Sequence, residues 1–299
     1  YKMIKEQFYE IEVEHGKLNY LTTQEILKSR YFYLSSTIFY WIEEMTRGPN
    51  KIIIIPYVAK YILPFLMKFL LQKDVCKLAG LDVATLFLAT AYIPCRNNGI
   101  NDVLDLMCNQ SCFNETPSSY QLKLQIAFVQ HYLSSQLLQL TEPQKEKIFD
   151  FIVSNIYNEQ YVEVRDRAAD VLSDIVHNIG DELELQKMIQ RFSSKLDGFS
   201  WEEKQKLSKS DTLIHGSVIG LGSIISAFPY VFPLPRWIPQ ELSRLATWAR
   251  TNGIAGVSAK NTIAEFKKVR TDTWHFDRTQ FTNEELEDLE GVLWRSYYA

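Results

Sequence analysis

The sequence predicts an all-α protein, an α-solenoid of helical repeats that ends in a cap helix and a short extended tail. Apolar residues recur at spacings of three and four along nearly the whole chain, and no long stretch alternates with the period of two that a half-buried strand requires. Short breakers separate these helical segments, and we expect them at 47–50, 96–99, 114–117 and 232–235. Many helices of middling length joined by short loops indicate a bundle or a solenoid.

Composition narrows the class of protein. The 299 residues include 46% apolar and 23% charged residues, and the formal net charge is -4. This apolar content is too high for a disordered chain, and the length suffices for one or two domains. Because a slightly acidic surface is a poor match for phosphate backbones, we expect no nucleic-acid partner.

The amino-terminal residues already show a helical pattern. The chain begins at Tyr1, and Ile4, Phe8, Ile11 and Val13 would form one apolar face. Each repeat of a solenoid buries its apolar face only against its neighbours. We therefore expect further repeats upstream of this sequence.

A second helix is predicted to start at a capping box. Thr22 and Glu25 have the spacing at which a side-chain hydroxyl and a carboxylate each bond a free backbone N–H. The inward positions of this helix would be Ile26, Leu27, Leu34, Ile38, Trp41 and Met45.

The most apolar stretch of the chain runs over 52–71 and is long enough to span a bilayer. Lys60 and Lys68 interrupt it, and Pro56 and Pro64 punctuate it. A charged side chain is costly inside a membrane. The stretch therefore predicts a buried helix pair, and no membrane is expected as a partner.

The middle and the last third of the chain are predicted to be helical as well. Thr141 and Gln144 make a second capping box, with Pro143 in the first turn. That helix would point Ile148, Phe151, Ile152 and Ile156 inward. Helices are also expected over 57–71, 75–92, 119–140, 162–178, 182–196, 211–227, 238–250 and 256–268.

One segment favours a solenoid over a bundle. Residues 164–175 have the pattern of the second helix of a HEAT repeat, in which Ala168 and Ala169 let a neighbouring helix approach closely. The apolar residues of this helix that would face the stack are Val164, Leu172 and Ile175. A weaker example covers 239–266. At ~40 to 47 residues per HEAT repeat, the chain holds roughly seven, so we assign 1–268 to one HEAT-repeat solenoid.

Three glycines in the helix predicted at 211–227 have two interpretations. Gly216, Gly220 and Gly222 could cradle a phosphate, but no strand precedes them and no dinucleotide fingerprint is complete. Close helix packing is the preferred interpretation.

The cysteines and histidines predict neither a metal site nor a disulfide framework. Four cysteines are too few and too unevenly spaced for such a framework. Cys108 and Cys112 would share a helical face, yet no neighbouring histidine completes a zinc set, so buried thiols are expected. This cysteine usage indicates a reducing compartment, the nucleus or the cytoplasm.

Charged clusters give little support to an enzyme. The carboxylate pairs Glu202-Glu203 and Glu284-Glu285 lie at helix starts that look exposed, with no nearby nucleophile or base. No phosphate loop and no cofactor motif is present. Lys204, Lys206 and Lys209 could bind an anion such as an inositol phosphate, but a solvated helix face is the preferred interpretation.

The segment 269–299 differs from the repeats. Residues 271–277 carry large aromatics with little periodicity, which suggests a strap across the final helices. Thr282 and Glu285 predict a capping box for one more helix. Its inward residues would be Leu286, Leu289 and Leu293, and its solvated acidic face would carry Glu284, Glu287, Asp288 and Glu290.

The last three residues, Tyr297, Tyr298 and Ala299, have the pattern hydrophobic, tyrosine, any residue. This pattern would arise by chance at roughly 2% in this composition. It offers an apolar side chain for a slot, a phenol hydroxyl and a free carboxylate that can pair with a buried lysine. The tail could enter a pocket on a partner, or the tyrosines could fold back onto the last helix of the protein itself.

Several segments of the final third resemble the large HEAT-repeat, ATP-independent proteasome activators, the two-hundred-kilodalton family found from yeast to mammals. The resemblance rests on 215–221, on Trp237-Ile238-Pro239, on Phe266-Lys267-Lys268 with Asp272 and Trp274 following, and on 296–299. Upstream of about residue 160, the sequence shows only a generic helical-repeat character, which is compatible with this family.

The resemblance implies a non-enzymatic regulator that caps the 20S proteasome core particle. Tyr297 would be the hydrophobic member, Tyr298 the essential tyrosine and Ala299 the free carboxyl end of a motif that docks between neighbouring subunits of the α ring. Docking would favour opening of the gate without ATP. The family is also linked to acetylated histones as substrates. The alternative is a generic HEAT-repeat scaffold or transport receptor that binds protein partners.

Overall fold

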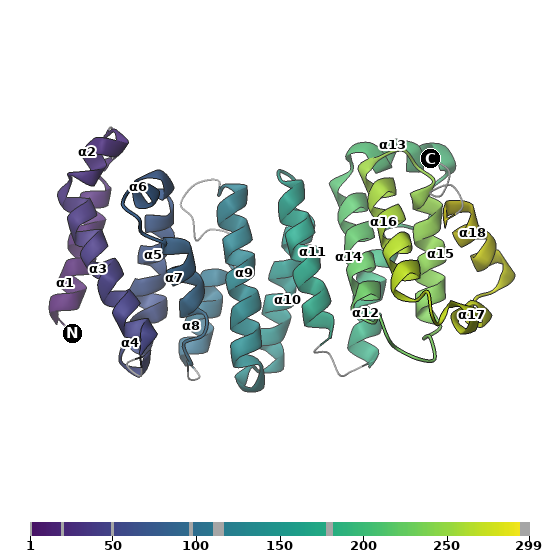
Figure 1. Ribbon diagram of the computed structural model, residues 1–299, viewed down its shortest axis with the longest axis horizontal. Coiled ribbons are helices and arrows are strands. Elements are labelled where there is room, and N and C mark those ends of the chain that lie inside the picture. The colour runs from purple at the N-terminus through teal and green to yellow at the C-terminus, as the bar shows by residue number, and fades with distance from the viewer. Residues whose placement is uncertain are drawn as a thin grey trace. The chain divides into compact units, whose positions relative to one another are not determined.

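Every regular element in the described part of the chain is a helix (Figure 1). The computed structural model describes residues 2–18, 21–48, 51–95, 98–109, 117–177 and 182–293. Over these residues no strand occurs, so the predicted all-α class is confirmed. The assignment of the repeats to the HEAT type stays a prediction.

Contacts within the chain define two units, Tyr1–Ile148 and Phe149–Ala299, and each is described by itself. Their boundary falls inside one helix, α10 (Glu142–Ile156). This grouping reflects contacts alone and does not test the predicted division at residue 268, which stays a prediction.

The first unit, unit 1, is built from short and medium-length helices. In order along the chain they are α1 (Lys2–His15), α2 (Thr23–Leu27), α3 (Arg30–Arg47), α4 (Lys51–Tyr57), the π-helical turn η2 (Val58–Ile62), α5 (Leu63–Leu70), α6 (Lys73–Leu78), α7 (Val83–Thr90), α8 (Asn98–Met107), α9 (Ser119–Gln136), the 3-10 turn η4 (Leu137–Gln139) and α10 (Glu142–Ile156).

The second unit, unit 2, contains the segment that resembled a known family. Its further elements are α11 (Val162–Val176), α12 (Glu182–Ser193), α13 (Trp201–Ser210), α14 (Thr212–Ser226), α15 (Trp237–Ala249), α16 (Ile254–Val269), α17 (Trp274–Asp277), the 3-10 turn η5 (Arg278–Gln280) and α18 (Asn283–Leu293). Within this unit α14 lies between α11 and α16, and α15 packs on both α16 and α18 (Figure 1).

The face predicted for α1 is partly right. Phe8 and Ile11 are buried, as expected. Val13 is 47% exposed, because it lies on the other side of the helix from these two residues. The side chain of Ile4 lies outside the described residues.

The helix predicted from Thr22 is two helices. The capping box of Thr22 and Glu25 forms as expected. However, α2 ends after one turn, and Ser29 caps the start of α3 through a bond from the Phe32 N–H to its hydroxyl. The restart shifts the inward face of α3, so that Leu34, Trp41 and Met45 are only partly buried and the buried positions are Tyr31, Ser35, Ile38, Phe39, Ile42 and Thr46.

The apolar stretch predicted as a helix pair is one continuous helical run made of α4, η2 and α5. By length and composition, Ile53–Leu70 could cross a membrane, with a mean hydropathy of 1.6. Half of this segment is buried inside the protein, so its apolar side chains serve at least partly as core. Lys68, within it, pairs with Glu12 of α1 at 2.5 Å.

Two boundaries in unit 1 differ from the expectation. The predicted helix over 75–92 is divided into α6 and α7 by Gly80, whose φ of 69° belongs to the left-handed region that favours glycine. Conversely, α8 starts within the predicted breaker 96–99. Its buried residues recur at helical spacing, which identifies it in retrospect: Ile100, Val103, Leu104 and Met107.

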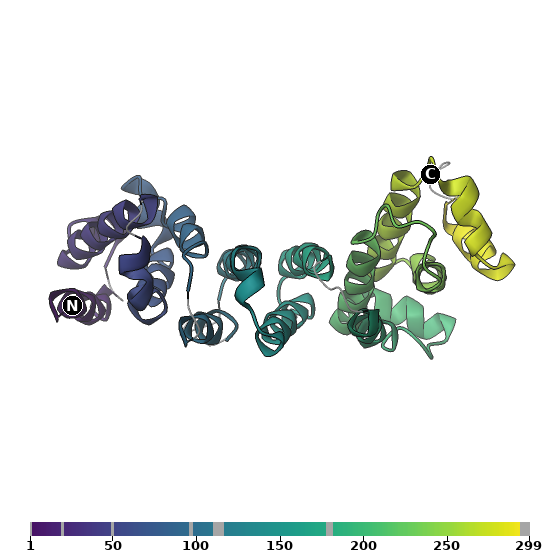
Figure 2. The ribbon, with the colours of Figure 1, turned by 90° about the horizontal axis from the view of Figure 1, so that it is seen from below.

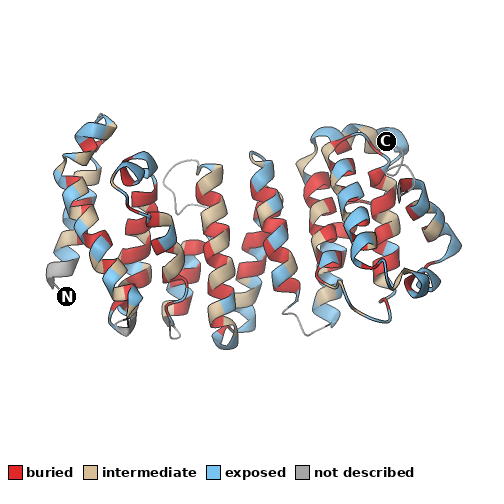
Figure 3. Cartoon of the chain, viewed as in Figure 1, coloured by how far each residue is buried: buried red, intermediate tan, exposed pale blue. Residues whose placement is uncertain are grey.

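Close packing around α14 confirms the interpretation of its glycines. Gly216, Gly220 and Gly222 are all buried. A Cβ atom on Gly216 would lie 2.6 Å from Tyr157 Cδ1 and 2.7 Å from the carbonyl oxygen of Ile156, which is too close for any side chain. The predicted inward residues of α11 are buried as well: Val164, Ala168, Ala169, Leu172 and Ile175. Figure 3 shows the buried residues as stripes along the helices.

Candidate partner-docking site at the carboxyl terminus

The three predicted docking residues, Tyr297, Tyr298 and Ala299, lie outside the described residues. The site is therefore described through the elements that lead to it, α17, η5 and α18. These elements form the end of unit 2, and α18 lies beside α15 there (Figure 2). Figure 2 views this arrangement from below.

α18 begins at the capping box predicted for Thr282. The Thr282 N–H donates to Glu285 Oε2 at 2.8 Å, and the Glu285 N–H donates to Thr282 Oγ1 at 3.3 Å. Leu289 and Val292 are buried, and Leu286 is half-buried. The helix therefore turns the predicted apolar face inward. The side chain of Leu293, the third predicted inward residue, lies outside the described residues.

A two-pronged ion pair joins the beginning of α18 to the beginning of α15. Arg236 Nη2 and Nη1 donate to the two carboxylate oxygens of Glu285 at 2.6 and 2.7 Å. The bonds from Arg236 hold the pKa of Glu285 below its usual range, since they favour the ionised carboxylate. Glu285 is buried, so the expectation that the Glu284-Glu285 pair is exposed is wrong for its second member.

Asp288, predicted to lie on a solvated acidic face, instead contacts α15 and its end. It accepts a hydrogen bond from Ser243 Oγ at 2.9 Å and pairs with Arg250 Nη2 at 2.8 Å. This half-buried carboxylate therefore faces α15, where Ser243 and the C-cap residue Arg250 satisfy it. Three acidic residues of α18 do remain exposed, as expected: Glu284, Glu287 and Glu290.

The strap predicted over 271–277 contains a helical turn, α17, held by a buried ion pair. Arg270 Nε and Nη2 donate to the Asp277 carboxylate at 2.8 Å each, and both side chains are almost fully buried. Burial alone would raise the pKa of Asp277, but the bonds from Arg270 and Thr273 more than offset it and hold the pKa below its usual range.

The same arginine also fixes the loop before α15. Arg270 Nη1 donates to the carbonyl oxygen of Pro229 at 2.9 Å, and Nη2 donates to that of Val231 at 3.0 Å. This one guanidinium therefore connects the end of α16, the turn α17 and the loop.

These pairs make a fixed base for the segment that follows α18. Three arginines, Arg236, Arg250 and Arg270, tie α18 and the turn before it to the helices α15 and α16. Six residues follow α18, and in extended form six residues reach at most ~20 Å. A tail that starts from a fixed helix loses less freedom on binding than one that starts from a mobile segment.

The lysines considered for an anion site do not share one exposed face. Lys204 Nζ donates to Thr247 Oγ1 at 2.9 Å and lies 5.5 Å from the ring centroid of Trp248. Lys206 and Lys209 are exposed. Glu203 forms a capping box with Ser200 at the start of this helix, α13. The acidic pair Glu202-Glu203 is therefore explained by its position in the first turn of the helix.

The cysteines that the structure describes are thiols. Cys76 and Cys95 are buried, and Cys108 is half-buried, while Cys112 lies outside the described residues. Burial raises the pKa of Cys76 to about 12, as expected of an inert core thiol. The described residues contain no group of three or more His, Cys, Asp or Glu arranged to hold a metal ion.

The arginines of this base are the residues that sequence reasoning missed. The pairs Arg236–Glu285 and Arg250–Asp288 join positions 49 and 38 residues apart. No local sequence pattern links positions so far apart. Arg270 and Asp277, by contrast, are only seven residues apart, so their pairing could have been predicted from the sequence.

Comparisons with known proteins agree with the resemblance noted in the sequence. Residues 211–299 match the family described as proteasome activator complex subunit 4-like, C-terminal. The chain is 57% identical over 298 residues to "Proteasome activator BLM10" of Saccharomyces cerevisiae, which is 99% of this chain and 14% of that protein.

More distant relatives carry related names. "Proteasome activator subunit 4" of Arabidopsis thaliana is 27% identical over 176 residues, 58% of this chain and 10% of that protein. "Proteasome activator complex subunit 4" of Homo sapiens is 27% identical over 160 residues, 50% of this chain and 8% of that protein. The chain thus spans a small part of each of these relatives. It belongs to the proteasome activator family that they represent, and its residues 211–299 correspond to the carboxyl-terminal region of that family.

Proposed function

We propose that this chain docks a proteasome activator on the 20S core particle through its last three residues. One observation carries the proposal: the segment that matches the carboxyl-terminal family model ends in Tyr297, Tyr298 and Ala299, the pattern hydrophobic, tyrosine, any residue. The names of the relatives describe activators of the proteasome, which supports a regulatory rather than a catalytic role.

In the proposed mechanism each tail residue has one task. Tyr297 fills an apolar slot between neighbouring subunits of the α ring, and Tyr298 places its hydroxyl against the turn that positions the gate. The terminal carboxylate of Ala299 pairs with a lysine in the pocket, a charge-assisted contact that needs a free carboxyl end. Preferential binding to the open form then shifts the gate equilibrium toward opening without ATP.

The fixed base under α18 supports this mechanism. Its ion pairs hold the helix that directly precedes the tail, so that docking does not have to fix the position of this helix. Contacts of the remaining repeats with the ring would add to the tail as a second binding element, and the two would reinforce each other.

The compartment follows from the same proposal. We place the activator in the nucleus and the cytoplasm, and the unpaired thiols of Cys76 and Cys95 support a reducing environment. Acetylated histones stay a prediction of the resemblance. The inward position of Lys204 leaves little support for an inositol phosphate on α13.

The test uses the full-length protein with purified 20S particles. Deleting 297–299, or replacing Tyr298→Ala, is expected to weaken association and stimulated peptide hydrolysis at least tenfold. Tyr230→Ala is the matched control, since Tyr230 is a tyrosine that is 83% exposed elsewhere in unit 2. Wild-type association of the Tyr298→Ala protein would refute the tail mechanism and favour a generic helical scaffold.

A peptide tests the terminal carboxylate separately. A peptide of residues 294–299 with a free carboxyl end should compete with the protein for 20S particles, and the same peptide with a terminal amide should compete at least tenfold less well. Equal competition by acid and amide would show that no lysine pairs with Ala299.

A further inference from the structure

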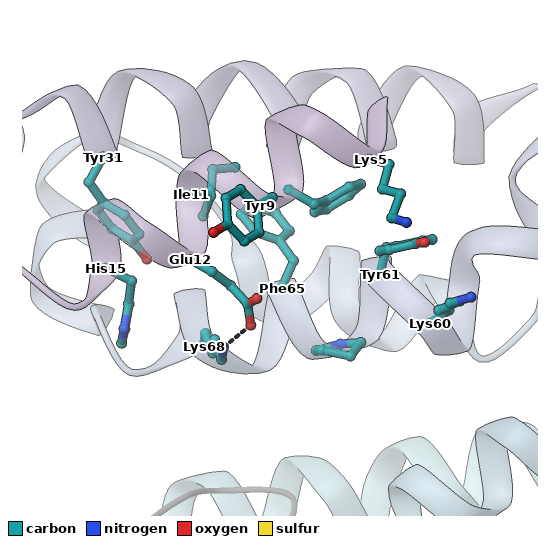
Figure 4. Close-up of a pocket in the computed structure, with 12 residues that line it drawn as sticks. Lys5, Tyr9, Ile11, Glu12, His15, Tyr31, Lys60, Tyr61, Phe65 and Lys68 are labelled. Atoms are coloured by element: carbon teal, nitrogen blue, oxygen red, sulfur yellow. Dashed lines mark hydrogen bonds and ion pairs between the residues drawn. The ribbon is translucent and has the colours of Figure 1, made fainter. Parts of the chain in front are cut away.

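A pocket in unit 1 lies between α1 and the helical run of η2 and α5, with α3 at one end (Figure 4). Its cavity volume is about 250 Å³. This region is remote in sequence from the tail, and the following inference is independent of the proposed function. The lining residues are Lys5, Phe8, Tyr9, Ile11, Glu12, His15, Tyr31, Lys60, Tyr61, Pro64, Phe65 and Lys68.

Aromatic rings make the floor and walls of this pocket. The ring of Phe8 stacks on Tyr61 with centroids 5.6 Å apart and an interplanar angle of 22°. Phe8 also meets Phe65 edge to face at 5.8 Å. Phe8 and Phe65 are buried, whereas Tyr9 is 68% exposed. The interior therefore suits a flat apolar group.

The π-helical turn η2 shapes one wall. Pro64 has no N–H to offer the carbonyl group of Lys60, and its ring crowds that carbonyl. The helix widens just before it, and the Leu63 N–H bonds the carbonyl oxygen of Val58, five residues back. Lys60 and Tyr61 of this turn both line the pocket.

More positively charged than negatively charged side chains line the pocket. Three lysines line it against one carboxylate, Glu12, and that carboxylate is already paired with Lys68. Lys5 and Lys60 have no ion pair and no hydrogen bond within the described residues. Figure 4 shows both of them beside Tyr61, at the end of the pocket opposite the Lys68–Glu12 pair.

The opposite end offers a neutral polar group. His15 Nε2 is buried and has no hydrogen-bond partner within the described residues. Burial, with the charge of Lys68, lowers the pKa of His15, so the imidazole is neutral at pH 7 and adds no charge to the site. The ring of His15 packs edge to face on Tyr31 at 5.5 Å.

We propose that this pocket binds an aromatic carboxylate of about the size of one amino acid, with its ring against Phe8, Tyr9 and Phe65 and its carboxylate at Lys5 and Lys60. A polyanion fits less well, because only two of the ammonium groups are unpaired and five of the twelve lining residues are phenylalanine or tyrosine. Such a carboxylate has two possible sources, a free small molecule or the carboxyl-terminal residue of a peptide.

The test measures binding of three probes to the full-length protein by calorimetry. N-acetyl-phenylalanine and the peptide Ala-Ala-Phe both carry the ring and a free carboxylate, and N-acetyl-phenylalanine amide lacks the charge. At least one acid should bind with a Kd below about 1 mM, as expected for a ligand of this size. The acid that binds more tightly identifies the source, and the amide should bind at least tenfold more weakly.

Variants connect the binding to this pocket. Replacing Lys5→Met and Lys60→Met together keeps the aliphatic stems and should weaken binding of the acid at least tenfold. Lys28→Met is the control, since Lys28 is an exposed lysine of unit 1 outside the pocket. The proposal is overturned if neither acid binds, if the amide binds as well as the acid, or if the double variant and the control behave alike.

Discussion

In unit 1 aromatic rings lie between the helices α1, α3 and α5, whereas in unit 2 arginine–carboxylate pairs join α18 to α15 and α17 to the end of α16. Phe65 and Phe69 of α5 lie 5.5 Å apart, and Phe69 contacts Tyr31 of α3 at 6.4 Å. Such apolar contacts depend little on pH or salt. In unit 2, removing one partner of a buried ion pair leaves the other charge without compensation, so its end should respond more strongly to single substitutions.

The largest effect is expected at the buried pair of unit 2. Replacing Asp277→Ala leaves the Arg270 guanidinium buried without its carboxylate, which should lower the free energy of unfolding by about 3 to 5 kcal/mol. Urea denaturation of the chain measures this loss.

Two further variants make the test specific. Asp272→Ala removes an exposed carboxylate from the same turn and should change the free energy of unfolding by less than about 0.5 kcal/mol. The double replacement Arg270→Met with Asp277→Leu should recover part of the loss, because no unpaired charge remains. If Asp277→Ala were as mild as the control, the pair would not anchor the end of unit 2.

Acidification should destabilise unit 2 at a buried histidine. His215 in α14 is buried, with Nε2 3.0 Å from Ser258 Oγ. Burial, with the charge of Arg165, lowers the pKa of His215 to about 4. Between the ordinary value of 6.5 and about 4 the unfolded state binds more protons, so the stabilisation is present above pH 6.5 and is lost as the pH falls toward 4.

The loss due to this group should reach at most about 3 kcal/mol across that window. Urea unfolding at pH 7 and at pH 4.5 measures it, and His215→Asn should flatten the pH dependence. His177→Asn, which alters an exposed imidazole of the same unit, serves as the control. An unchanged slope in His215→Asn would assign the acid sensitivity to other groups.

Helix packing gives an intermediate effect. A methyl group at Gly216 of α14 would collide with the backbone carbonyl of Ile156 at 2.7 Å, so Gly216→Ala should cost about 1 to 3 kcal/mol of stability. A Cβ atom added to Gly99 of α8 would lie 3.6 Å from its nearest neighbour, Cys95 Cβ, which is an ordinary van der Waals contact.

Gly99→Ala in unit 1 should therefore be neutral or stabilise by up to about 1 kcal/mol, because alanine favours the helix. Thermal unfolding of the two variants gives the comparison. Equal melting temperatures for both would show that α14 can move away from α10 at little cost, contrary to the close contact at Gly216.

These cases show which features sequence reasoning could reach. The capping boxes at Thr22 and Thr282 could be predicted because the two residues of each box lie within four positions of each other. The close packing at the glycines of α14 could be predicted because no phosphate-binding motif was complete. The break at Ser29 was missed, since a serine hydroxyl that can cap a new helix can also lie within a continuous one.

The candidate site shows the complementary limit. Asp288 was assigned to solvent because its neighbours on α18 are acidic, and only the fold brings Ser243 and Arg250 of another helix to it. The inward face of an amphipathic helix follows from its apolar positions, whereas the partner of a charged side chain depends on which helices are neighbours.

The smallest effect is expected at a surface pair of unit 1. Arg30 of α3 and Glu10 of α1 pair at 3.1 Å, and both side chains are about half exposed or more. In water such a pair gains little, because solvent screens the charges and the long side chains lose freedom. A double-mutant cycle with Arg30→Gln and Glu10→Gln should give a coupling below about 0.5 kcal/mol.

The same cycle at Arg236→Gln and Glu285→Gln sharpens the contrast between the units. There the carboxylate is buried and held by two parallel bonds, so the coupling should exceed that of the Arg30–Glu10 pair. Equal couplings would mean that burial of Glu285 adds nothing to the pair. The end of unit 2 would then depend on its apolar contacts, Leu289 and Val292, in the same way as unit 1 depends on its rings.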